Sequence, residues 1–143
     1  MLTLRRNSGF TLLEMIVVLV IIGLLMGLVG PRVFKQADKA KVQTAETQVV
    51  MLKGALQTMR LDINRFPTKE EGLALLINNV SGDTNWDGPY LDGELPLDPW
   101  DRPYQYSPAK SKSQPFTLYS MGADGKLGGE EYDSDVGYVP LAD

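Results

Sequence analysis

The sequence GFTLLEMIVVLVIIGLLMGLVG, residues 9–30, decides the fold of the N-terminal part of this chain. From Phe10 to Gly30 this run contains one charged residue, Glu14. Since about 20 apolar residues are enough for a helix to cross a bilayer, we expect a transmembrane helix here. A carboxylate within such a helix costs roughly 2.5–3.5 kcal/mol at the bilayer centre and less near its surface. Glu14 is therefore a functional candidate, although the helix dipole alone also favours an acid in the first turn.

The residues before the apolar run differ from an ordinary secretory signal. Arg5 and Arg6 precede the run, but no A-x-A cleavage site follows it. The charges beyond the run leave the positive-inside rule ambiguous. These charges are Arg32, Lys35, Lys39 and Lys41.

The order Ser8-Gly9-Phe10-Thr11-Leu12-Leu13-Glu14 resembles the prepilin leader of type IV pilins and their relatives. This resemblance implies that a prepilin peptidase cuts between Gly9 and Phe10, that the apolar helix is kept, and that the new Phe10 amine is methylated. It also implies that Glu14 pairs with the terminal amine of a neighbouring subunit. The alternative is a plain signal anchor.

The apolar run also carries signals for helix packing and for a break. Gly23 and Gly27 form a G-x-x-x-G pattern, which allows close helix contact in lipid, although glycine is in any case frequent in membrane helices. Pro31 removes a helix hydrogen bond, so we expect a kink or a locally melted stretch there. The pilin resemblance implies that the helix loosens near this proline in assembled filaments.

A second helical segment follows, with an apolar stripe on one face. The stripe consists of Val42, Ala45, Val49, Leu52, Leu56, Met59 and Ile63. We expect it to pack against a sheet of the same domain, with a coiled coil as the alternative. Asp62, Asn64 and Pro67 end the helix.

The rest of the chain predicts a small α+β domain. Thr68 and Glu71 form a capping box ahead of a short helix. Residues 83–103 form a connector, which we expect to be packed by Trp86, Tyr90 and Trp100. Strands are expected at residues 104–107, 116–121 and 136–139, with a turn from 107 to 115. A small antiparallel sheet on the amphipathic helix completes the predicted fold class.

The amino-acid composition argues against nucleic-acid binding and against enzymatic activity. The net charge of −4 falls to −6 without the two leader arginines, so no nucleic-acid groove is indicated. The chain contains no cysteine and no histidine, so a disulfide framework and the commonest general base are both missing. Ser107 and Lys110 formally fit S-x-x-K, but their companion motifs are absent from the sequence. We therefore predict that the chain is not an enzyme.

Acidic residues gather in a glycine-rich segment near the end of the sequence. They are Asp124, Glu130, Glu131, Asp133 and Asp135. Carboxylates on a flexible backbone suit Ca²⁺, which takes six to eight oxygen ligands, better than Mg²⁺. The alternating ladder of an EF-hand is missing, and a merely solvated acidic loop is the alternative.

Several motifs resemble the major pseudopilin family of type II secretion systems over nearly the whole chain. They are Phe66-Pro67-Thr68, Gly88-Pro89-Tyr90, Asp98-Pro99-Trp100, Arg102-Pro103-Tyr104, Gly122-Ala123-Asp124-Gly125 and Gly128-Gly129. Asp101 departs from the glycine that the family commonly has after the tryptophan. The segment from Ser107 to Gln114 lacks the family's usual proline-glycine turn. The family's calcium site implies Asp124 and Asp135 as the first side-chain ligands. Asp133 and the carbonyls of Met121 and Leu127 are the next candidates, with Glu130 and Glu131 facing solvent.

The resemblance implies a division into a leader at 1–9, a transmembrane and assembly helix at 10–31, and a periplasmic pilin-like domain at 32–143. Phe10, Glu14 and Pro31 would serve assembly. The implied function is a structural one: a subunit of an inner-membrane filament that drives export of folded proteins across the outer membrane. Copies of itself, minor pseudopilins, a membrane platform protein and an assembly ATPase are the implied partners. The alternatives are a type IV pilin, a DNA-uptake pseudopilin, or an anchored calcium-dependent hydrolase or binding module.

Overall fold

The computed structural model describes residues 9–109, 111 and 113–141, so the leader residues up to Ser8 and Lys110 lie outside the described residues. The helices are α1 (Leu12–Ile63) and the 3-10 helices η1 (Gly72–Leu76) and η2 (Glu131–Asp133). The strands are β1 (Gln105–Pro108), β2 (Phe116–Ser120) and β3 (Val136–Tyr138). The chain divides into two compact units, one ending at Ala37 and one running from Asp38 to Asp143. The predicted boundaries at 9/10 and 31/32 stay predictions.

The first unit contains the apolar part of α1. This helix is long and apolar enough to cross a membrane, and none of its most apolar window is buried within the chain. The helix continues through Gly30 and Pro31. Of the two alternatives predicted there, the locally melted stretch is wrong for this structure, and the kink stays a prediction. Proline removes a single donor, and the turns on both sides keep their own hydrogen bonds.

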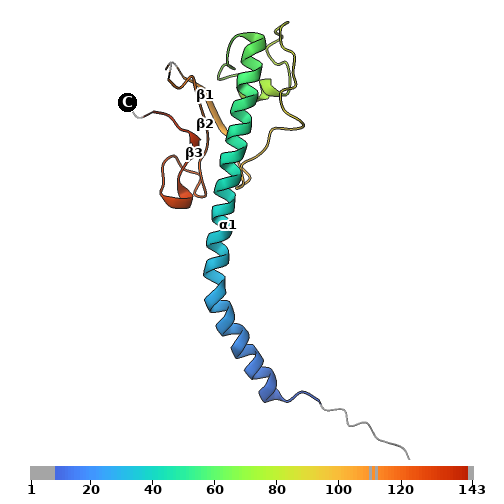
Figure 1. The fold of residues 1–143 in the computed structure, drawn as a ribbon, viewed down its shortest axis with the longest axis vertical. Coiled ribbons are helices and arrows are strands. Elements are labelled where there is room, and N and C mark those ends of the chain that lie inside the picture. Colours follow the sequence, from blue (N-terminus) through green and yellow to red (C-terminus); the bar gives the residue numbers. More distant parts are fainter. Residues whose placement is uncertain (1–8, 110, 112, 142–143) are drawn as a thin grey trace, which may run out of the picture. The chain divides into compact units, whose positions relative to one another are not determined.

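The second unit is built on the amphipathic part of α1. Its buried side chains confirm the predicted stripe with the exception of Val42, which is half-buried. Leu52, Leu56 and Met59 are fully buried and belong to one core cluster with Leu118 of β2. The stripe packs against a sheet of the same domain, as predicted, and the strands lie beside this part of α1 (Figure 1).

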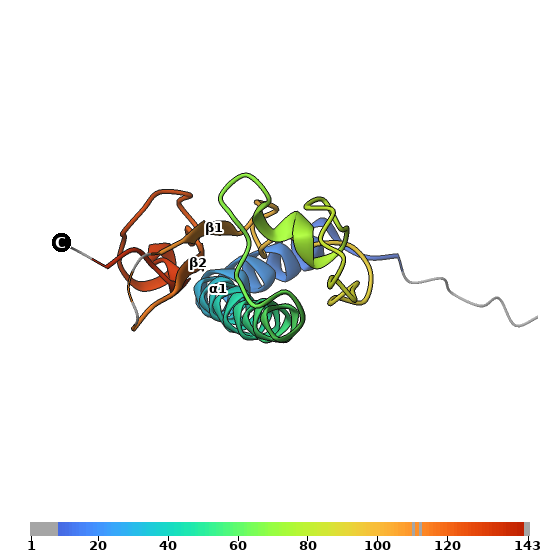
Figure 2. The same ribbon diagram turned by 90° about the horizontal axis from the view of Figure 1, so that it is seen from above.

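The sheet is antiparallel with the order β1-β2-β3. In the register, Tyr106 lies opposite Leu118, and Leu118 lies opposite Tyr138. Along β2, Phe116, Leu118 and Ser120 are buried and alternate with half-buried residues. Viewed from the other direction, β1 and β2 again lie next to α1 (Figure 2). The three predicted strands and the α+β class are confirmed, although β1 begins at Gln105 and extends through Pro108, which the sequence assigned to a turn.

The end of α1 and the capping box follow the sequence prediction. Asn64, with φ 55°, takes the left-handed conformation after the last helical residue, and its amide donates to the Arg60 carbonyl. The Thr68 amide donates to the Glu71 carboxylate (2.8 Å), and the Glu71 amide donates to the Thr68 hydroxyl (3.3 Å). This reciprocal pair is a complete capping box. The helix behind it, η1, has 3-10 geometry.

The connector from residue 83 to 103 is held by its aromatic residues. The Trp86 indole donates to the Leu75 carbonyl (2.7 Å), and its ring meets Tyr90 edge-on with the centroids 5.6 Å apart. The Tyr90 hydroxyl donates to Asp62 on α1 (2.8 Å). Trp100 is half-buried and lies outside the residues that pack on the core cluster. The predicted packing therefore comes from Trp86 and Tyr90.

Candidate functional site

The N-terminus of α1 is fixed by a cap that the sequence analysis did not identify. Thr11 precedes the first helical residue, and its hydroxyl accepts a hydrogen bond from the Glu14 amide at 3.2 Å. This bond satisfies one of the donors that every helix start leaves free. The signal was present, because Thr11 and Glu14 have the spacing of a capping box. The cap therefore sets the position of Glu14 in the first turn.

The Glu14 carboxylate is exposed. Within residues 9–109, 111 and 113–141, its carboxylate takes part in no hydrogen bond or ion pair, unlike the Glu71 carboxylate in the second capping box. A carboxylate at the start of an apolar helix, with its own amide already capped, can pair with a cation supplied from outside the chain.

The apolar face that surrounds Glu14 is an exposed surface. Phe10 is 77% exposed, and the side chains from Leu12 to Phe34 are exposed in the same way. A Cβ added at Gly23 or Gly27 would meet nothing within 4 Å. Such a surface suits lipid or the corresponding surface of other helices, and the two glycines allow close approach.

The second candidate is the acidic loop, residues 121–135, which joins β2 to β3. The Asp135 carboxylate accepts a hydrogen bond from the Gly128 amide (2.8 Å), and the Asp135 amide donates to the Gly128 carbonyl (3.2 Å). The loop is closed so tightly that a Cβ on Gly122 would lie 2.6 Å from the Asp133 carbonyl oxygen. Gly122 also has a φ of 61°, which favours glycine.

The other oxygen of Asp135 indicates what the loop can bind. Asp135 Oδ1 is buried and has no hydrogen-bond partner within the described residues. A buried carboxylate oxygen without a partner costs free energy, and a hard cation would relieve that cost. The loop offers further carboxylate and carbonyl oxygens of the kind that Ca²⁺ prefers. The residues present therefore fit such an ion.

The remaining predicted ligands lie along the same loop. Asp124 Oδ1 accepts a hydrogen bond from the Lys126 amide (2.9 Å), and the Met121 carbonyl accepts one from the Gly125 amide (3.1 Å). Asp133 and Leu127 are exposed, as are Glu130 and Glu131. Among the described residues, no three acidic side chains gather in an arrangement that could hold a metal. The structure thus brings the predicted ligand residues to one loop without gathering their side chains around one point.

Arg102 ties the connector to the start of the acidic loop. Its guanidinium donates to the carbonyls of Gly122 and Ala123, and its Nε lies 4.0 Å from Asp98 Oδ2. A Cβ on Gly125 would collide with the same guanidinium. In the sequence, Arg102 stood out only as part of a family motif, because nothing in the spacing shows that residues 20 positions apart meet. Arg102 is therefore a structural partner of the loop that sequence reasoning missed.

Tyr104, which is buried, and Tyr106, which is half-buried, both have raised pKa values but structural roles. Burial raises the pKa of both Tyr104 and Tyr106, so each stays a neutral hydroxyl. The Tyr104 hydroxyl donates to Gln48 (2.5 Å), and the Tyr106 hydroxyl donates to the Pro67 carbonyl (2.9 Å). Both bonds join the sheet region to other elements of the core. Ser107, the one described residue of the S-x-x-K pair, lies in β1.

Comparison with known proteins gives two family matches. Residues 32–139 match the family model described as type II secretion system (T2SS), protein G. Residues 4–30 match the model of the prokaryotic N-terminal methylation motif. Together these matches cover the apolar helix and the folded domain.

Individual proteins agree with these models. The type II secretion system core protein G of Pseudomonas aeruginosa is 43% identical over 93% of this chain and 95% of its own length. The protein of the same name from Aeromonas hydrophila is 42% identical over 97% of this chain and 96% of its own length. The crystal structure of the major pseudopilin from the type 2 secretion system of enterohaemorrhagic Escherichia coli superposes with a TM-score of 0.56. It is 34% identical and covers 71% of this chain and 88% of that chain.

Proposed function

Because the chain belongs to the type II secretion system protein G family, it is a structural subunit of the secretion pseudopilus, and we propose how its parts serve that role. The family is one of structural pseudopilins, and our proposal gives the chain no catalytic site. The type IV pilin, the DNA-uptake pseudopilin and the calcium-dependent hydrolase considered from the sequence are not supported by these matches.

We propose that the subunit is anchored in the inner membrane by residues 10–31, with the domain from residue 32 onward in the periplasm. The exposed apolar surface from Leu12 to Phe34 is the observation that carries this proposal. The match of residues 4–30 to the N-terminal methylation motif supports cleavage between Gly9 and Phe10, followed by methylation of Phe10. Mass spectrometry of the protein extracted from membranes should find methylated Phe10 at the terminus. An uncut Met1 in cells that secrete normally would contradict the proposal.

We propose that Glu14 makes the contact that orders assembly. Its carboxylate is exposed in an apolar surface, and its amide is already satisfied by Thr11. The terminal amine that cleavage before Phe10 would create on a neighbouring copy is a cation that could fill this place. The pairing would be strong in lipid, where a lone carboxylate is unfavourable.

The variant Glu14→Val tests this role. It should insert in the membrane and fold, because the change makes the helix more apolar and leaves the folded domain untouched, yet filament yield should fall at least tenfold. Glu46→Gln removes an exposed carboxylate from the same helix outside the apolar run and is the matched control. Equal filament yield from Glu14→Val and the parent would leave Glu14 a helix-start residue only.

We propose that the working assembly is a helical filament of copies of this chain, joined by minor pseudopilins. A prepilin peptidase, a membrane platform protein and an assembly ATPase would process and drive it. Membership of a secretion pseudopilin family supports assembly with other components of that system, and the exposed helix surface supports packing between copies. Electron microscopy of cells that overproduce the chain with its secretion genes, compared with cells lacking the platform protein, tests this arrangement.

We propose further that the acidic loop holds Ca²⁺. Asp135 and Asp124 are the side chains that would bind the ion, with Asp133 and the Met121 and Leu127 carbonyls as additional ligands. The buried, unpartnered Oδ1 of Asp135 supports this proposal. When bound, the ion would neutralise the loop and tie its residues together, which is a structural effect.

A further inference from the structure

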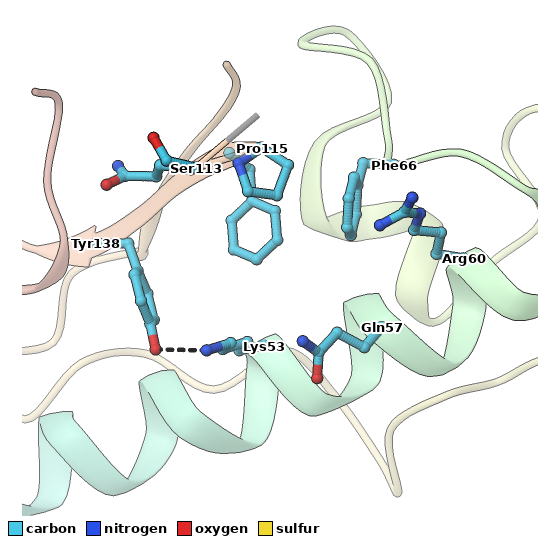
Figure 3. A pocket seen from close by; sticks show the side chains of 9 residues that line it. Lys53, Gln57, Arg60, Phe66, Ser113, Pro115 and Tyr138 are labelled. Carbon is cyan, nitrogen blue, oxygen red and sulfur yellow. Dashed lines mark hydrogen bonds between the residues drawn. The ribbon is translucent and has the colours of Figure 1, made fainter. Parts of the chain in front are cut away.

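A groove with positive charge lies between α1 and the sheet, apart from the apolar helix and the acidic loop. Lys53, Gln57 and Arg60 follow one another at the spacing of a single helix face and form one side. The aromatic residues Phe66, Phe116 and Tyr138 also line it. Figure 3 shows Phe66 and Tyr138 beside the pocket. The cavity has a volume of about 350 Å³. No acidic side chain lines it.

Both cations of the groove are placed by aromatic rings. Lys53 Nζ donates to the Tyr138 hydroxyl (2.7 Å) and lies 4.6 Å from the centroid of that ring. The Arg60 guanidinium carbon lies 5.0 Å from the Phe66 centroid. Ring faces attract cations without neutralising them. The groove therefore holds two oriented positive charges on an apolar floor.

The charge of the groove is not balanced within the part of the chain that the structure describes. The ion pairs there are Arg65–Glu71 and Arg102–Asp98, and neither includes Lys53 or Arg60. The chain as a whole has 18 acidic against 14 basic residues, so a basic groove is a local exception. A groove of this kind fits carboxylates presented by another molecule.

We propose that this groove receives the Asp92-Gly93-Glu94 turn of a second copy of this chain, an inference that rests on assembly of copies into a filament. Asp92 and Glu94 are exposed, and Gly93 has a φ of 98°. Leu91 is buried on one side of the turn, and Leu95 packs on the core cluster on the other. The core therefore fixes both ends of the turn and leaves its two acidic residues exposed.

The spacing of the charges agrees with this pairing. Lys53 and Arg60 are seven residues apart, or about 10 Å along a helix at 1.5 Å per residue. Asp92 and Glu94 are two positions apart on a turn, so their Cα atoms are separated by at most about 6–7 Å, and their side chains can spread further. The exposed pair Glu130 and Glu131 is less suitable, because Glu131 already lines a groove with Lys39 of its own chain.

A zero-length carbodiimide cross-linker tests the contact on the full chain in assembled filaments. This reagent joins an amine to a carboxylate only where the two touch. Filaments grown from a mixture of ¹⁴N- and ¹⁵N-labelled subunits distinguish links between copies from links within one chain. We expect mixed-isotope peptides that join Lys53 to Asp92 or Glu94. Filaments that form normally but link Lys53 to other acids, or to none, would overturn the proposal.

Charge exchange gives an independent test. Lys53→Glu with Arg60→Glu should lower filament yield roughly three- to tenfold, the effect of losing two partly exposed ion pairs and gaining repulsion. Adding Asp92→Lys with Glu94→Lys should restore at least half of the parent yield. Adding Glu130→Lys with Glu131→Lys, a change of equal charge, should not. If Glu130→Lys with Glu131→Lys restored the yield, or if neither pair of changes did, the groove would make a different contact from the one proposed.

Two controls separate assembly from folding. Tyr138→Phe removes the hydrogen bond to Lys53 and keeps the charge of the groove, so its filament yield should equal that of the parent. The groove variants should give the same circular dichroism and melting temperature as the parent. Absence of filaments from the parent itself would count against the proposed function, whereas filaments without the Lys53 link count against the groove alone.

Discussion

The Ser120 hydroxyl donates a hydrogen bond of 2.5 Å to Asp98 Oδ2, although the two residues lie 22 positions apart. Ser120 is 0% exposed and Asp98 is 3% exposed. The other oxygen of Asp98 accepts from the amides of Trp100 (3.0 Å) and Arg102 (2.9 Å). A buried carboxylate with this many donors is fully satisfied, and it fixes the connector to the central strand of the sheet.

Replacing Asp98 and replacing Ser120 should have unequal effects on the free energy of unfolding. Asp98→Ala leaves three donors without an acceptor, so we expect it to lower the free energy of unfolding by about 2–4 kcal/mol. Ser120→Ala removes one hydrogen bond and should cost about 1–2 kcal/mol. Urea unfolding of the unit from Asp38 onward measures both. Asp92→Ala, at an exposed acid of the same connector, should stay within about 0.5 kcal/mol. An equal decrease in the free energy of unfolding for all three variants would show that the hydrogen-bond network contributes no more to stability than an exposed acid does.

The Arg65–Glu71 pair predicts a pH dependence. Arg65 donates two hydrogen bonds to the Glu71 carboxylate (2.6 and 2.8 Å) and lowers its pKa. A carboxylate whose pKa is lower in the folded state stabilises the fold above its unfolded value of about 4.3, and this stabilisation disappears as the pH falls through the folded value. The parent should therefore be more stable than Glu71→Gln at pH 7, and the difference should shrink below about pH 4. A difference that is constant from pH 7 to pH 3 would contradict this account.

Asp101 should be better replaced by glycine. It has a φ of 62°, a conformation that costs a residue with a Cβ about 1 kcal/mol, and its side chain makes no hydrogen bond within the described residues. Asp101→Gly should therefore raise the free energy of unfolding by up to about 1 kcal/mol, reduced by the greater freedom of glycine in the unfolded chain. Gly122→Ala, where the Cβ would meet the Asp133 carbonyl, should lower it. Chemical denaturation compares the two, and a less stable Asp101→Gly would show that the aspartate has a favourable local role.

Calcium should raise the melting temperature of the folded unit. An ion that binds only the folded state stabilises it by about 2.7 kcal/mol at a hundredfold excess over its Kd. Asp135→Ala and Asp124→Ala should remove most of this gain, and a chelator should abolish it in the parent. Glu130→Ala and Glu131→Ala are matched acidic controls that should keep most of the response, and Mg²⁺ should act more weakly. Identical melting curves of the parent in Ca²⁺ and in chelator would leave the loop a solvated acidic surface.

The periodic parts of this fold were predictable because the spacing of apolar residues along the sequence indicates which side chains of a helix or strand are buried. The stripe from Ala45 to Ile63 repeats at helical steps, and it is the buried face of α1. The alternation in Phe116–Ser120 gave the central strand. Thr68 and Glu71 gave a capping box in which both hydrogen bonds form, since that motif depends on contacts three residues apart.

Contacts between distant segments were not predictable in the same way. Nothing in the sequence near Arg102 shows that its guanidinium reaches the carbonyls of Gly122 and Ala123. The bond between Ser120 and Asp98 likewise depends on how the connector folds back on the sheet. The departure at Asp101 was visible in the sequence, but its physical meaning required the backbone conformation of the folded chain, in which Asp101 has a positive φ. Such contacts are set by tertiary packing, which leaves no periodic signal.

The exposed apolar surface of α1 determines how a filament of these subunits can be taken apart. When transmembrane helices exchange lipid contacts for contacts with one another, their apolar atoms stay in an apolar environment. The hydrophobic effect therefore contributes almost nothing to the association of these helices. In the arrangement that we propose, subunits can enter and leave the filament without exposing this apolar surface to water. A released subunit would not diffuse into the aqueous phase, because the exposed apolar part of α1 is insoluble in water. In the arrangement that we propose, the bilayer would therefore hold both the subunits waiting to join the filament and those released from it.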